Sequence, residues 1–401
     1  MIIEQLPTEF KEAEPVLAQI EAAGFEAYFV GGCVRDTILG QPLHDIDIAT
    51  SAYPGEIKAI FSRTVDTGIE HGTVMILDHG KGYETTTFRT ETGYQDFRRP
   101  DEVTFVRSLA EDLQRRDFTI NALALKRTGE VIDLFDGLHD LTNRLIRAVG
   151  NPDERFHEDA LRMMRAVRFA SQLDFEIDPE TIQGITDNAH LLSKIAVERI
   201  QVELEKLFVG TNPTKGLQVM METDLYEYTP TLADQSMTLK NLLALDNWHL
   251  TSPVSVWATL MFAGGHDDQT IPGLLKQWKL SNDCIKESRL VVQFLDALQN
   301  HQVTPELLFK MNAKRLQWAH EVAQVLNIEH DQATIMRDYA QLPIHDAHEL
   351  AIKGGDLITG VGIKPGPQLG QIIRQLQVAV LTQKAKNQPV DLIALASKLK
   401  G

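Results

Sequence analysis

The feature of this sequence that most constrains its fold is a change in hydrophobic periodicity near residue 150. Before that point, short apolar segments that alternate or run together are interspersed with stretches of helical spacing. Beyond it, apolar residues recur at three- and four-residue steps, as at Ile195, Ile200, Leu204, Leu207 and Phe208. The pattern predicts an α+β fold, in which a mixed sheet with helices is followed by an all-α remainder.

The predicted strands and helices of the first part all lie between residues 26 and 135. The expected strands are EAYFV, DIDIAT, GTVMILD, GYETTTF, EVTFV and EVIDLF, and the expected helices are residues 33–40, 54–61 and 109–125.

Length and composition restrict the class of protein. The chain of 401 residues is too long for a single hydrophobic core and suits two to four domains. No run approaches the roughly 18 apolar residues of a membrane span, and the first ten residues lack the pattern of a signal peptide. Two cysteines, Cys33 and Cys284, make no disulfide framework or metal-ligand spacing. We therefore expect a cytoplasmic protein without membrane contact.

The net charge of −17 excludes a surface that is basic throughout. It does not exclude a local basic site on an acidic body. Any contact with nucleic acid must therefore be focused on a small region.

The segment HDIDIAT places two carboxylates close together. In a strand, Asp45 and Asp47 point to the same face, while Ile46 and Ile48 point to the other. Two like charges so close repel each other unless a cation lies between them. Carboxylates together with substrate phosphates are ligands that Mg²⁺ prefers, so the pair predicts a magnesium site. The alternative is an exposed strand face with two solvated acids.

A second pattern, YFVGGCVRD, precedes the aspartates. An apolar strand ends at Gly31 and Gly32, and a helix begins there. The glycines allow close approach of a ligand to the backbone and its free amides, and Arg35 supplies a charge suited to phosphate oxygens. The combination predicts a triphosphate cradle beside a metal pair, against the alternative of an ordinary tight turn with a surface arginine.

The whole stretch GGCVRDTILGQPLHDIDIAT resembles the head-domain signature of the tRNA nucleotidyltransferase and bacterial poly(A) polymerase family, within the polymerase-β superfamily. The resemblance is specific over about residues 25–210. It implies a polymerase-β-like head and addition of nucleotides to an RNA 3′ end without a nucleic-acid template.

Two further segments extend the resemblance in the head. RRDFTINALAL, residues 115–125, reads as a helix-like run, and the family pattern assigns Arg116 to nucleotide contact. The resemblance also implies a mobile loop at residues 90–101. Glu84 is either a third carboxylate beside the aspartates or a solvated strand residue.

The segment ERFHEDALRMMRAVRFA, residues 154–170, predicts one amphipathic helix. Its apolar side carries alanine, methionine and valine, and the opposite half carries Arg162, Arg165 and Arg168. One interpretation is a solvated face with ion pairs. The other is an anion-binding face, because three arginines at steps of three repel each other unless an anion lies across them.

Within this segment, Asp159 and Arg162 match the Glu-Asp-x-x-Arg motif of the family. A carboxylate accepts from the exocyclic amine of cytosine or adenine, and a guanidinium donates to the ring acceptor beside it. Uracil and guanine place a carbonyl oxygen opposite the carboxylate and are rejected. The resemblance assigns these two residues to base selection, and Arg165 and Arg168 to further nucleotide contact.

Other matching segments are expected to be structural. In AVERIQVELEKLF, residues 196–208, Glu198 and Arg199 are predicted to position neighbouring helices. In GIKPGPQLGQII, residues 362–373, the prolines and glycines suit a helix-start turn, which either touches an RNA phosphate or only joins two helices. The His266-Asp267 pair is expected to lie in a loop.

With these residues, the resemblance implies a CCA-adding member of the tRNA nucleotidyltransferase family that uses CTP, ATP and Mg²⁺. The catalytic and metal-binding residues are Asp45 and Asp47, and the nucleotide-binding residues are Gly32, Arg35, Arg116, Asp159, Arg162, Arg165 and Arg168. The predicted domains are a head (1–145), a nucleotide-selecting neck (146–215), a helical body (216–300) and a tRNA-binding tail (301–401). The alternatives are a poly(A) polymerase, an enzyme adding only CC or only A, and a non-catalytic RNA-binding protein. The sequence leaves the oligomeric state open, a homodimer included.

Overall fold

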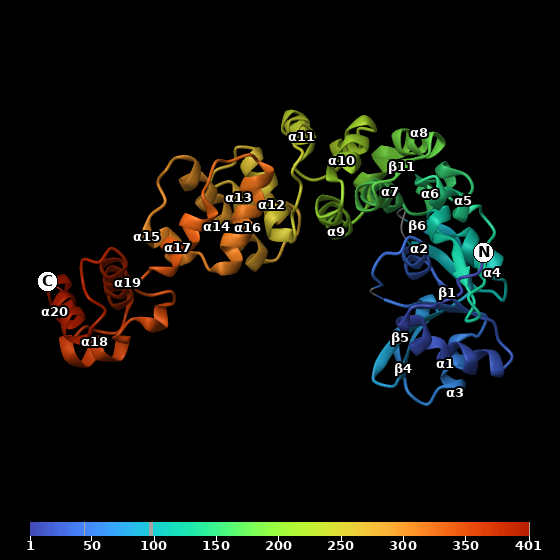
Figure 1. Ribbon diagram of the computed structural model, residues 1–401, viewed down its shortest axis with the longest axis horizontal. Helices are drawn as coiled ribbons and strands as arrows, with labels where there is room; N and C mark the ends of the chain where they lie inside the picture. The colour runs from blue at the N-terminus through green and yellow to red at the C-terminus, as the bar shows by residue number, and fades with distance from the viewer. Residues whose placement is uncertain (44, 96–98, 401) are drawn as a thin grey trace. The chain divides into compact units, whose positions relative to one another are not determined.

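The computed structural model describes residues 1–43, 45–95 and 99–400. These residues form two compact units, Met1–Leu243 and Ala244–Gly401. Figure 1 shows the strands of the first unit beside its helices, and the second unit as helices alone. The α+β class is therefore confirmed, whereas the division into head, neck, body and tail stays a prediction.

A mixed sheet of seven strands forms the centre of the head. Its order is β3-β4-β5-β2-β1-β8-β9, and its neighbours are antiparallel except for the parallel pair β2 and β5. The strands are β1 (Ala27–Val30), β2 (Asp47–Thr50), β3 (Thr64–Gly68), β4 (Thr73–Asp78), β5 (Lys81–Thr87), β8 (Leu123–Leu125) and β9 (Val131–Asp133).

The head helices surround this sheet and complete its core. A buried cluster joins β1 and β8 to the helix at Leu109 and Leu113, with Phe88 fully buried between them. The helices of this part are α1 (Thr8–Ala22), α2 (Gly32–Ile38), α3 (Pro54–Ile60), α4 (Leu109–Gln114) and α5 (Gly137–Thr142).

The remainder of the first unit consists mainly of helices, of which α9 and α10 pack on α7. They are α6 (Pro152–Glu158), α7 (Leu161–Leu173), α8 (Pro179–Asn188), α9 (Val197–Phe208), α10 (Pro213–Glu222) and α11 (Ser236–Leu243). A small parallel pair, β10 (Leu145–Ile146) and β11 (Glu176–Ile177), is an exception to the all-α prediction.

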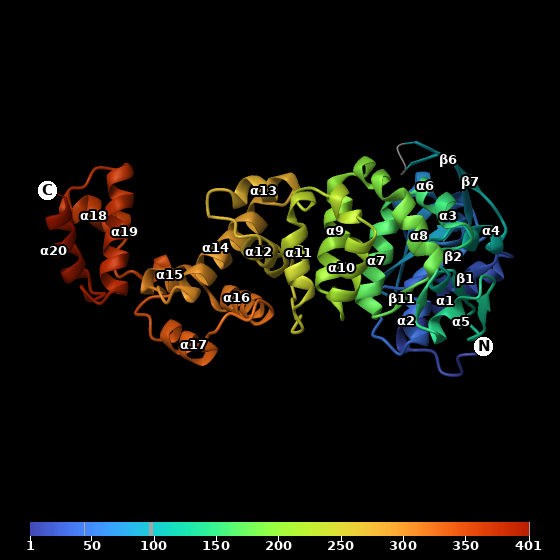
Figure 2. The ribbon, with the colours of Figure 1, turned by 90° about the horizontal axis from the view of Figure 1, so that it is seen from above.

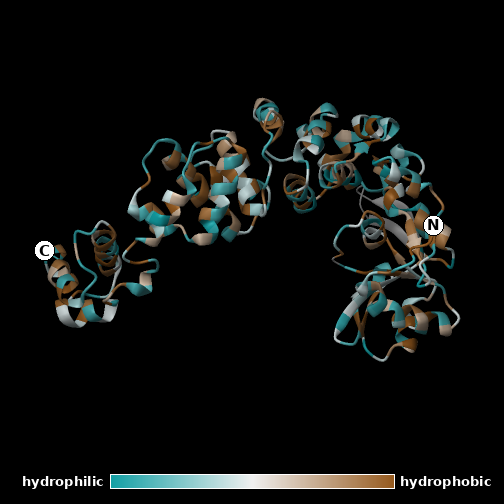
Figure 3. Cartoon of the chain, viewed as in Figure 1, coloured by the Kyte–Doolittle hydropathy of each residue, from teal (hydrophilic) through white to brown (hydrophobic). Residues whose placement is uncertain are grey.

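The second unit contains helices that bury their apolar faces against one another. Trp257, Phe294 and Val322 form its centre, and the Trp257 and Trp278 rings lie 4.9 Å apart. Figure 2 shows its last three helices lying together, and Figure 3 shows hydrophobic and hydrophilic residues on different sides of its helices. The helices are α12 (Pro253–Ala263), α13 (Ile271–Gln277), α14 (Asn282–Gln299), α15 (Pro305–Lys310), α16 (Ala313–Val325), α17 (Gln332–Ala340), α18 (Gly354–Val361), α19 (Pro367–Leu381) and α20 (Pro389–Leu399).

Two predictions about loops in this unit are confirmed. His266 and Asp267 lie between α12 and α13, and α19 begins at Pro367 after a glycine with positive φ. Among the described residues, no helix combines the length and apolar character that crossing a membrane requires.

Three local predictions are wrong. Residues 115–125 do not form a helix, because the apolar run Leu123–Leu125 is the buried strand β8, hydrogen-bonded between β1 and β9. Most of residues 90–101, expected as a loop, belong to the paired strands β6 (Arg89–Gln95) and β7 (Arg99–Phe105), and residues 96–98 lie outside the described part. The segment 154–170 is two helices, α6 and α7, separated at Asp159.

Candidate active site

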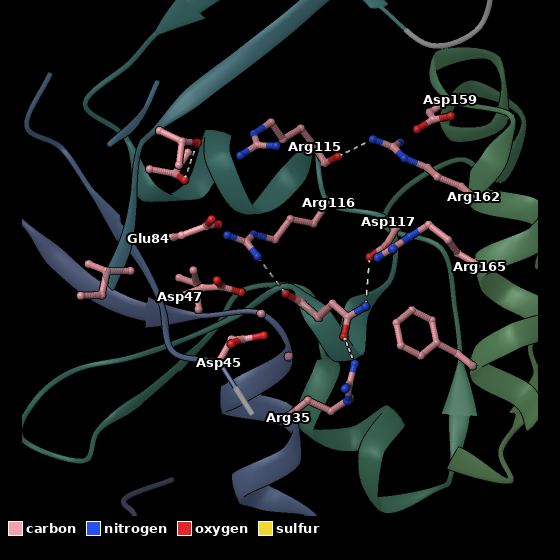
Figure 4. A pocket seen from close by; sticks show the side chains of 18 of the residues that line it. Arg35, Asp45, Asp47, Glu84, Arg115, Arg116, Asp117, Asp159, Arg162 and Arg165 are labelled. Carbon is pink, nitrogen blue, oxygen red and sulfur yellow. Dashed lines mark hydrogen bonds and ion pairs between the residues drawn. The ribbon is translucent and has the colours of Figure 1, made fainter. Parts of the chain in front are cut away.

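One cavity of about 700 Å³ lies between the sheet and α7. Figure 4 shows its acidic side, with Asp45, Asp47 and Glu84, across from α7 with Arg162 and Arg165. The cavity brings together every residue that the sequence proposes for the site, namely Gly32, Arg35, Asp45, Asp47, Arg116, Asp159, Arg162, Arg165 and Arg168.

The paired carboxylates are positioned differently from the prediction. Asp47 is the first residue of β2, whereas Asp45 precedes the strand, so the alternation of one strand does not align the two. Both nevertheless reach the same cavity, and Glu84 lies in register with Asp47 on the neighbouring strand β5.

The charges around Asp47 suit a cation. Although part of its surface faces the cavity, the protein around its carboxylate and the nearby charges of Glu84 and Asp45 raise its pKa, and only Arg116 opposes them. Crowded carboxylates of this kind fit a divalent ion that takes one or two protein carboxylates plus substrate phosphates. Within the described ranges, no three His, Cys, Asp or Glu side chains are grouped closely enough to hold a metal by themselves.

The Gly31-Gly32 turn faces the same space as Arg116. Gly31 adopts φ 74°, and a Cβ added there would lie 3.1 Å from Arg116 Nη1, so a larger residue would be strained and crowded. Arg116 Nε is buried and has no hydrogen-bond partner among the described residues. An anion held between this turn and Arg116 would lie beside Nη1 of the guanidinium.

Arg35 joins the turn to α7 through a chain of polar contacts. Its Nη1 donates to Asn121 Oδ1 at 2.7 Å, and Asn121 Nδ2 donates to Asp117 Oδ1 at 3.1 Å. Asp117 Oδ2 accepts from Arg165 Nε at 2.7 Å. Although burial alone would raise the pKa of Asp117, Arg165 and the hydrogen bond from Asn121 hold it well below its usual value. The two arginines are thus fixed relative to each other.

Asp159 lies at the break between α6 and α7. Its backbone is extended, with φ −143°, and Oδ1 accepts from the Leu161 amide at 3.1 Å. Arg199 on α9 donates from Nη1 to Oδ1 at 3.1 Å and from Nη2 to Oδ2 at 2.7 Å. The carboxylate is therefore held in one orientation by a residue 40 positions away.

Arg162 is 8% exposed and is also held by protein groups. Nη1 donates to Glu158 Oε2 at 2.6 Å, and Nη2 donates to the Arg115 carbonyl at 2.7 Å. The proposed base-reading pair is thus rigidly supported on both sides.

The expectation that the three arginines need an external anion is wrong. Each pairs with a protein carboxylate: Arg162 with Glu158 at 2.6 Å, Arg165 with Asp117 at 2.5 Å and Arg168 with Glu203 at 2.5 Å. Protein charges relieve their repulsion. The interpretation as a solvated face also fails, because Arg162 and Arg168 are buried.

The sequence did not single out several other residues that line the cavity. Asp117 and Asn121 lie in the 115–125 segment, and their spacing of four residues is the one sequence signal that could have paired them. Thr73, Thr86, Arg89, Arg115, Phe169 and Lys206 carried no signal that distinguished them from structural residues.

A mixed sheet with paired carboxylates at a glycine turn, facing an arginine-lined cavity, defines a nucleotidyltransferase. Three family models match the chain: "Poly A polymerase head domain" at residues 27–147, "Probable RNA and SrmB-binding site of polymerase A" at 174–235, and "tRNA nucleotidyltransferase domain 2 putative" at 248–396. The chain belongs to the CCA-adding enzymes of the class II tRNA nucleotidyltransferase/poly(A) polymerase family.

Similar proteins cover nearly the whole chain. The CCA-adding enzyme of Lactiplantibacillus plantarum is 58% identical over 398 residues, covering 99% of this chain and 98% of the relative. That of Limosilactobacillus reuteri is 59% identical over 393 residues, covering 98% of each. The crystal structure of the Bacillus stearothermophilus CCA-adding enzyme in complex with CTP has a TM-score of 0.87 and 39% identity, covering 98% of each chain.

Proposed function

We propose that this chain adds and repairs the 3′-terminal CCA sequence of tRNA from CTP and ATP, without a nucleic-acid template. The family and the near-complete similarity to CCA-adding enzymes support this activity. The observation that carries the assignment of residues is that the paired carboxylates, the glycine turn and the Asp159–Arg162 pair line one cavity.

Asp45 and Asp47 are the proposed ligands of Mg²⁺. When bound, the ion supplies positive charge at the reacting phosphate and at the attacking and leaving oxygens. The tRNA 3′-hydroxyl gives up its proton to solvent, its oxygen forms a bond to the α-phosphorus, and the bond from that phosphorus to the leaving diphosphate breaks. Catalysis rests on positioning and electrostatics, with no covalent enzyme intermediate.

The triphosphate lies between the glycine turn and two arginines. Gly32 lets the nucleotide approach the backbone, and Arg35 and Arg116 donate to phosphate oxygens. The position of Arg116 supports this role, because the residue lines the cavity and its Nη1 lies beside the glycine turn.

Asp159 and Arg162 select the base. Oδ1 of Asp159 already accepts from Leu161 and Arg199, whereas Oδ2 accepts once and retains a lone pair for the amine of cytosine or adenine. Arg162 donates to the neighbouring ring acceptor. Uracil or guanine would set a carbonyl oxygen against the carboxylate, so both are excluded. Arg165 and Arg168, which also line the cavity, are the proposed further contacts to the nucleotide.

The remaining assignments concern partners. We expect the helical residues 301–401 to bind tRNA and the protein to act in the cytoplasm, and a homodimer stays a prediction.

The direct test is an addition assay with tRNA that lacks its 3′ CCA, together with CTP, ATP and Mg²⁺. Growth by C, C and A, absent from Asp45→Asn, is expected. An unlimited A tail would identify a poly(A) polymerase. Arrest after two C residues would identify a CC-adding enzyme, and addition only to tRNA that already ends in CC would identify an A-adding enzyme. No growth at all would favour a non-catalytic RNA-binding protein.

A further inference from the structure

We propose that Asp112 is a positioning residue that holds Arg116 in its triphosphate-binding orientation and fixes the start of β6 beside the site. This inference rests on the proposed function. Asp112 does not itself line the cavity. It acts through residues that do.

Asp112 is a buried carboxylate at the centre of a cluster of hydrogen bonds. It lies on α4 and is 1% exposed. Its Oδ1 accepts from Arg115 Nε at 3.0 Å, from Arg115 Nη2 at 2.7 Å and from the Arg89 amide at 3.3 Å. Its Oδ2 accepts from Arg116 Nη2 at 3.2 Å. One carboxylate therefore connects α4, the start of β6 and a cavity arginine.

The bond to Arg116 determines where that guanidinium can point. On its other side, Arg116 faces Asp47 and lies near Glu84 (Figure 4). Without Asp112, the guanidinium would turn fully toward these two carboxylates, of which Asp47 is a proposed ligand of the metal. Asp112 thus keeps Arg116 beside Gly31, with Nη1 next to the glycine turn.

The bonds to Arg115 and Arg89 link the same carboxylate to base selection. Arg115 Nε also donates to the Arg89 carbonyl at 3.1 Å, so Arg89 is held by both its amide and its carbonyl. The Arg115 carbonyl in turn accepts from Arg162 at 2.7 Å. The triphosphate arginine and the base-reading arginine therefore share one support.

Burial and charge agree with this role. Burial alone would raise the pKa of Asp112, but Arg115, Arg116 and the hydrogen bonds to it hold the pKa below its usual value. Asp112 is therefore ionised at neutral pH. The isosteric change Asp112→Asn removes the charge while keeping the shape.

The experiment measures KM and kcat for CTP and for ATP with tRNA substrates that end before C or before A. Asp112→Asn is expected to raise both KM values by similar factors, about tenfold to a hundredfold, because both nucleotides present the same triphosphate to Arg116. kcat is expected to change much less. Asp112→Glu, which keeps the charge but displaces it, should give intermediate KM values.

A double-variant cycle tests whether Asp112 acts through Arg116. If it does, Asp112→Asn combined with Arg116→Gln should raise KM no further than Arg116→Gln alone. If the KM of the double variant instead rises by the product of the two single-variant factors, Asp112 does not act through Arg116 and the proposal is wrong. Titration calorimetry measures CTP binding directly, without the addition reaction. A wild-type protein that binds CTP but adds nothing to tRNA would therefore refute the proposed function without bearing on the role of Asp112.

Asp140→Asn is the matched control. Asp140 is fully buried on α5 and accepts from Thr119 Oγ1 at 2.5 Å and from Arg147 Nε at 3.0 Å, but it does not line the cavity. Its variant should lose thermal stability and keep the wild-type KM values. If Asp112→Asn behaves in the same way, Asp112 is only structural and the proposal is wrong. Should Asp112→Asn fail to fold, wild-type KM values in Asp112→Glu would equally overturn it.

Discussion

Replacing Arg199 by glutamine tests whether base selection depends on a fixed orientation of Asp159. Arg199 makes two hydrogen bonds to that carboxylate, at 3.1 and 2.7 Å, and the two side chains are 26% and 20% exposed. Hydrogen bonds to charged groups contribute about 1.5–3 kcal/mol when buried, and exposed pairs contribute at most about 1 kcal/mol. For this partly exposed pair we expect a loss of about 1.5 kcal/mol.

That loss corresponds to about a tenfold fall in kcat/KM for both CTP and ATP. Selectivity should fall as well. In the proposed site of the wild type, uracil would set its carbonyl oxygen against a carboxylate that cannot turn away, at a cost of about 1–3 kcal/mol. In Arg199→Gln the carboxylate can rotate, so discrimination against UTP should fall by about tenfold.

The assay compares single-nucleotide addition of CTP, ATP and UTP to tRNA lacking its 3′ CCA. Arg144→Gln is the control, because Arg144 pairs with Asp174 at 2.9 Å in the same unit, outside the cavity. It should keep wild-type selectivity. If Arg199→Gln also keeps wild-type discrimination against UTP, a fixed Asp159 does not select the base and the reasoning fails.

Two further predictions concern the carboxylate pair and helix packing. The pKa of Asp47 is higher in the folded protein than in the unfolded chain, so the folded protein binds the carboxyl proton more tightly. At pH values above the raised pKa, ionised Asp47 therefore destabilises the metal-free fold. Asp47→Asn should therefore abolish nucleotide addition yet raise the melting temperature measured in EDTA, and a lower melting temperature would contradict this. As the pH is lowered at low Mg²⁺, wild-type activity should begin to fall at a higher pH than the pKa of an ordinary aspartate predicts. Loss of activity only near the ordinary pKa of aspartate would contradict the second expectation. Gly216→Ala on α10 places a Cβ 2.5 Å from the Val167 carbonyl and should lower the free energy of unfolding by about 1–3 kcal/mol, measured by urea denaturation. Gly273→Ala on α13, where no neighbouring atom lies within 4 Å, should leave the free energy of unfolding unchanged or raise it by up to about 1 kcal/mol. Equal losses of stability in the two variants would refute the close packing of Gly216 against Val167.

Sequence periodicity predicts the fold class and most elements, but it fails where distant residues decide the local structure. The run Leu123–Leu125 has apolar residues compatible with helix or strand. It becomes a strand because β1 and β9 supply hydrogen-bond partners on both sides, and that pairing is invisible in a local window.

The break at Asp159 has a similar origin. The helical pattern continues through residues 154–170, yet Asp159 is extended and its carboxylate is held by Arg199 from α9. The partners of the three arginines on α7 also come from other segments, apart from Glu158. A single sequence gives the charges in order but not the carboxylates that face them.

The sequence motifs predict the residues of the site more fully than the residues that hold them in position. The nine proposed site residues line one cavity, whereas Asp112 belongs to none of the motifs that the sequence offers. Its spacing of three and four from Arg115 and Arg116 was visible in the sequence. The burial that makes this spacing important appears only once α4 packs on the sheet.

The most direct test of the central claim is a crystal structure of the protein with CTP and Mn²⁺ in place of Mg²⁺. We predict an anomalous peak at about 2.0–2.3 Å from carboxylate oxygens of Asp45 and Asp47, in contact with the triphosphate beside Gly32 and Arg116. A well-ordered CTP with its ion bound elsewhere, and both aspartates turned to solvent, would contradict the account.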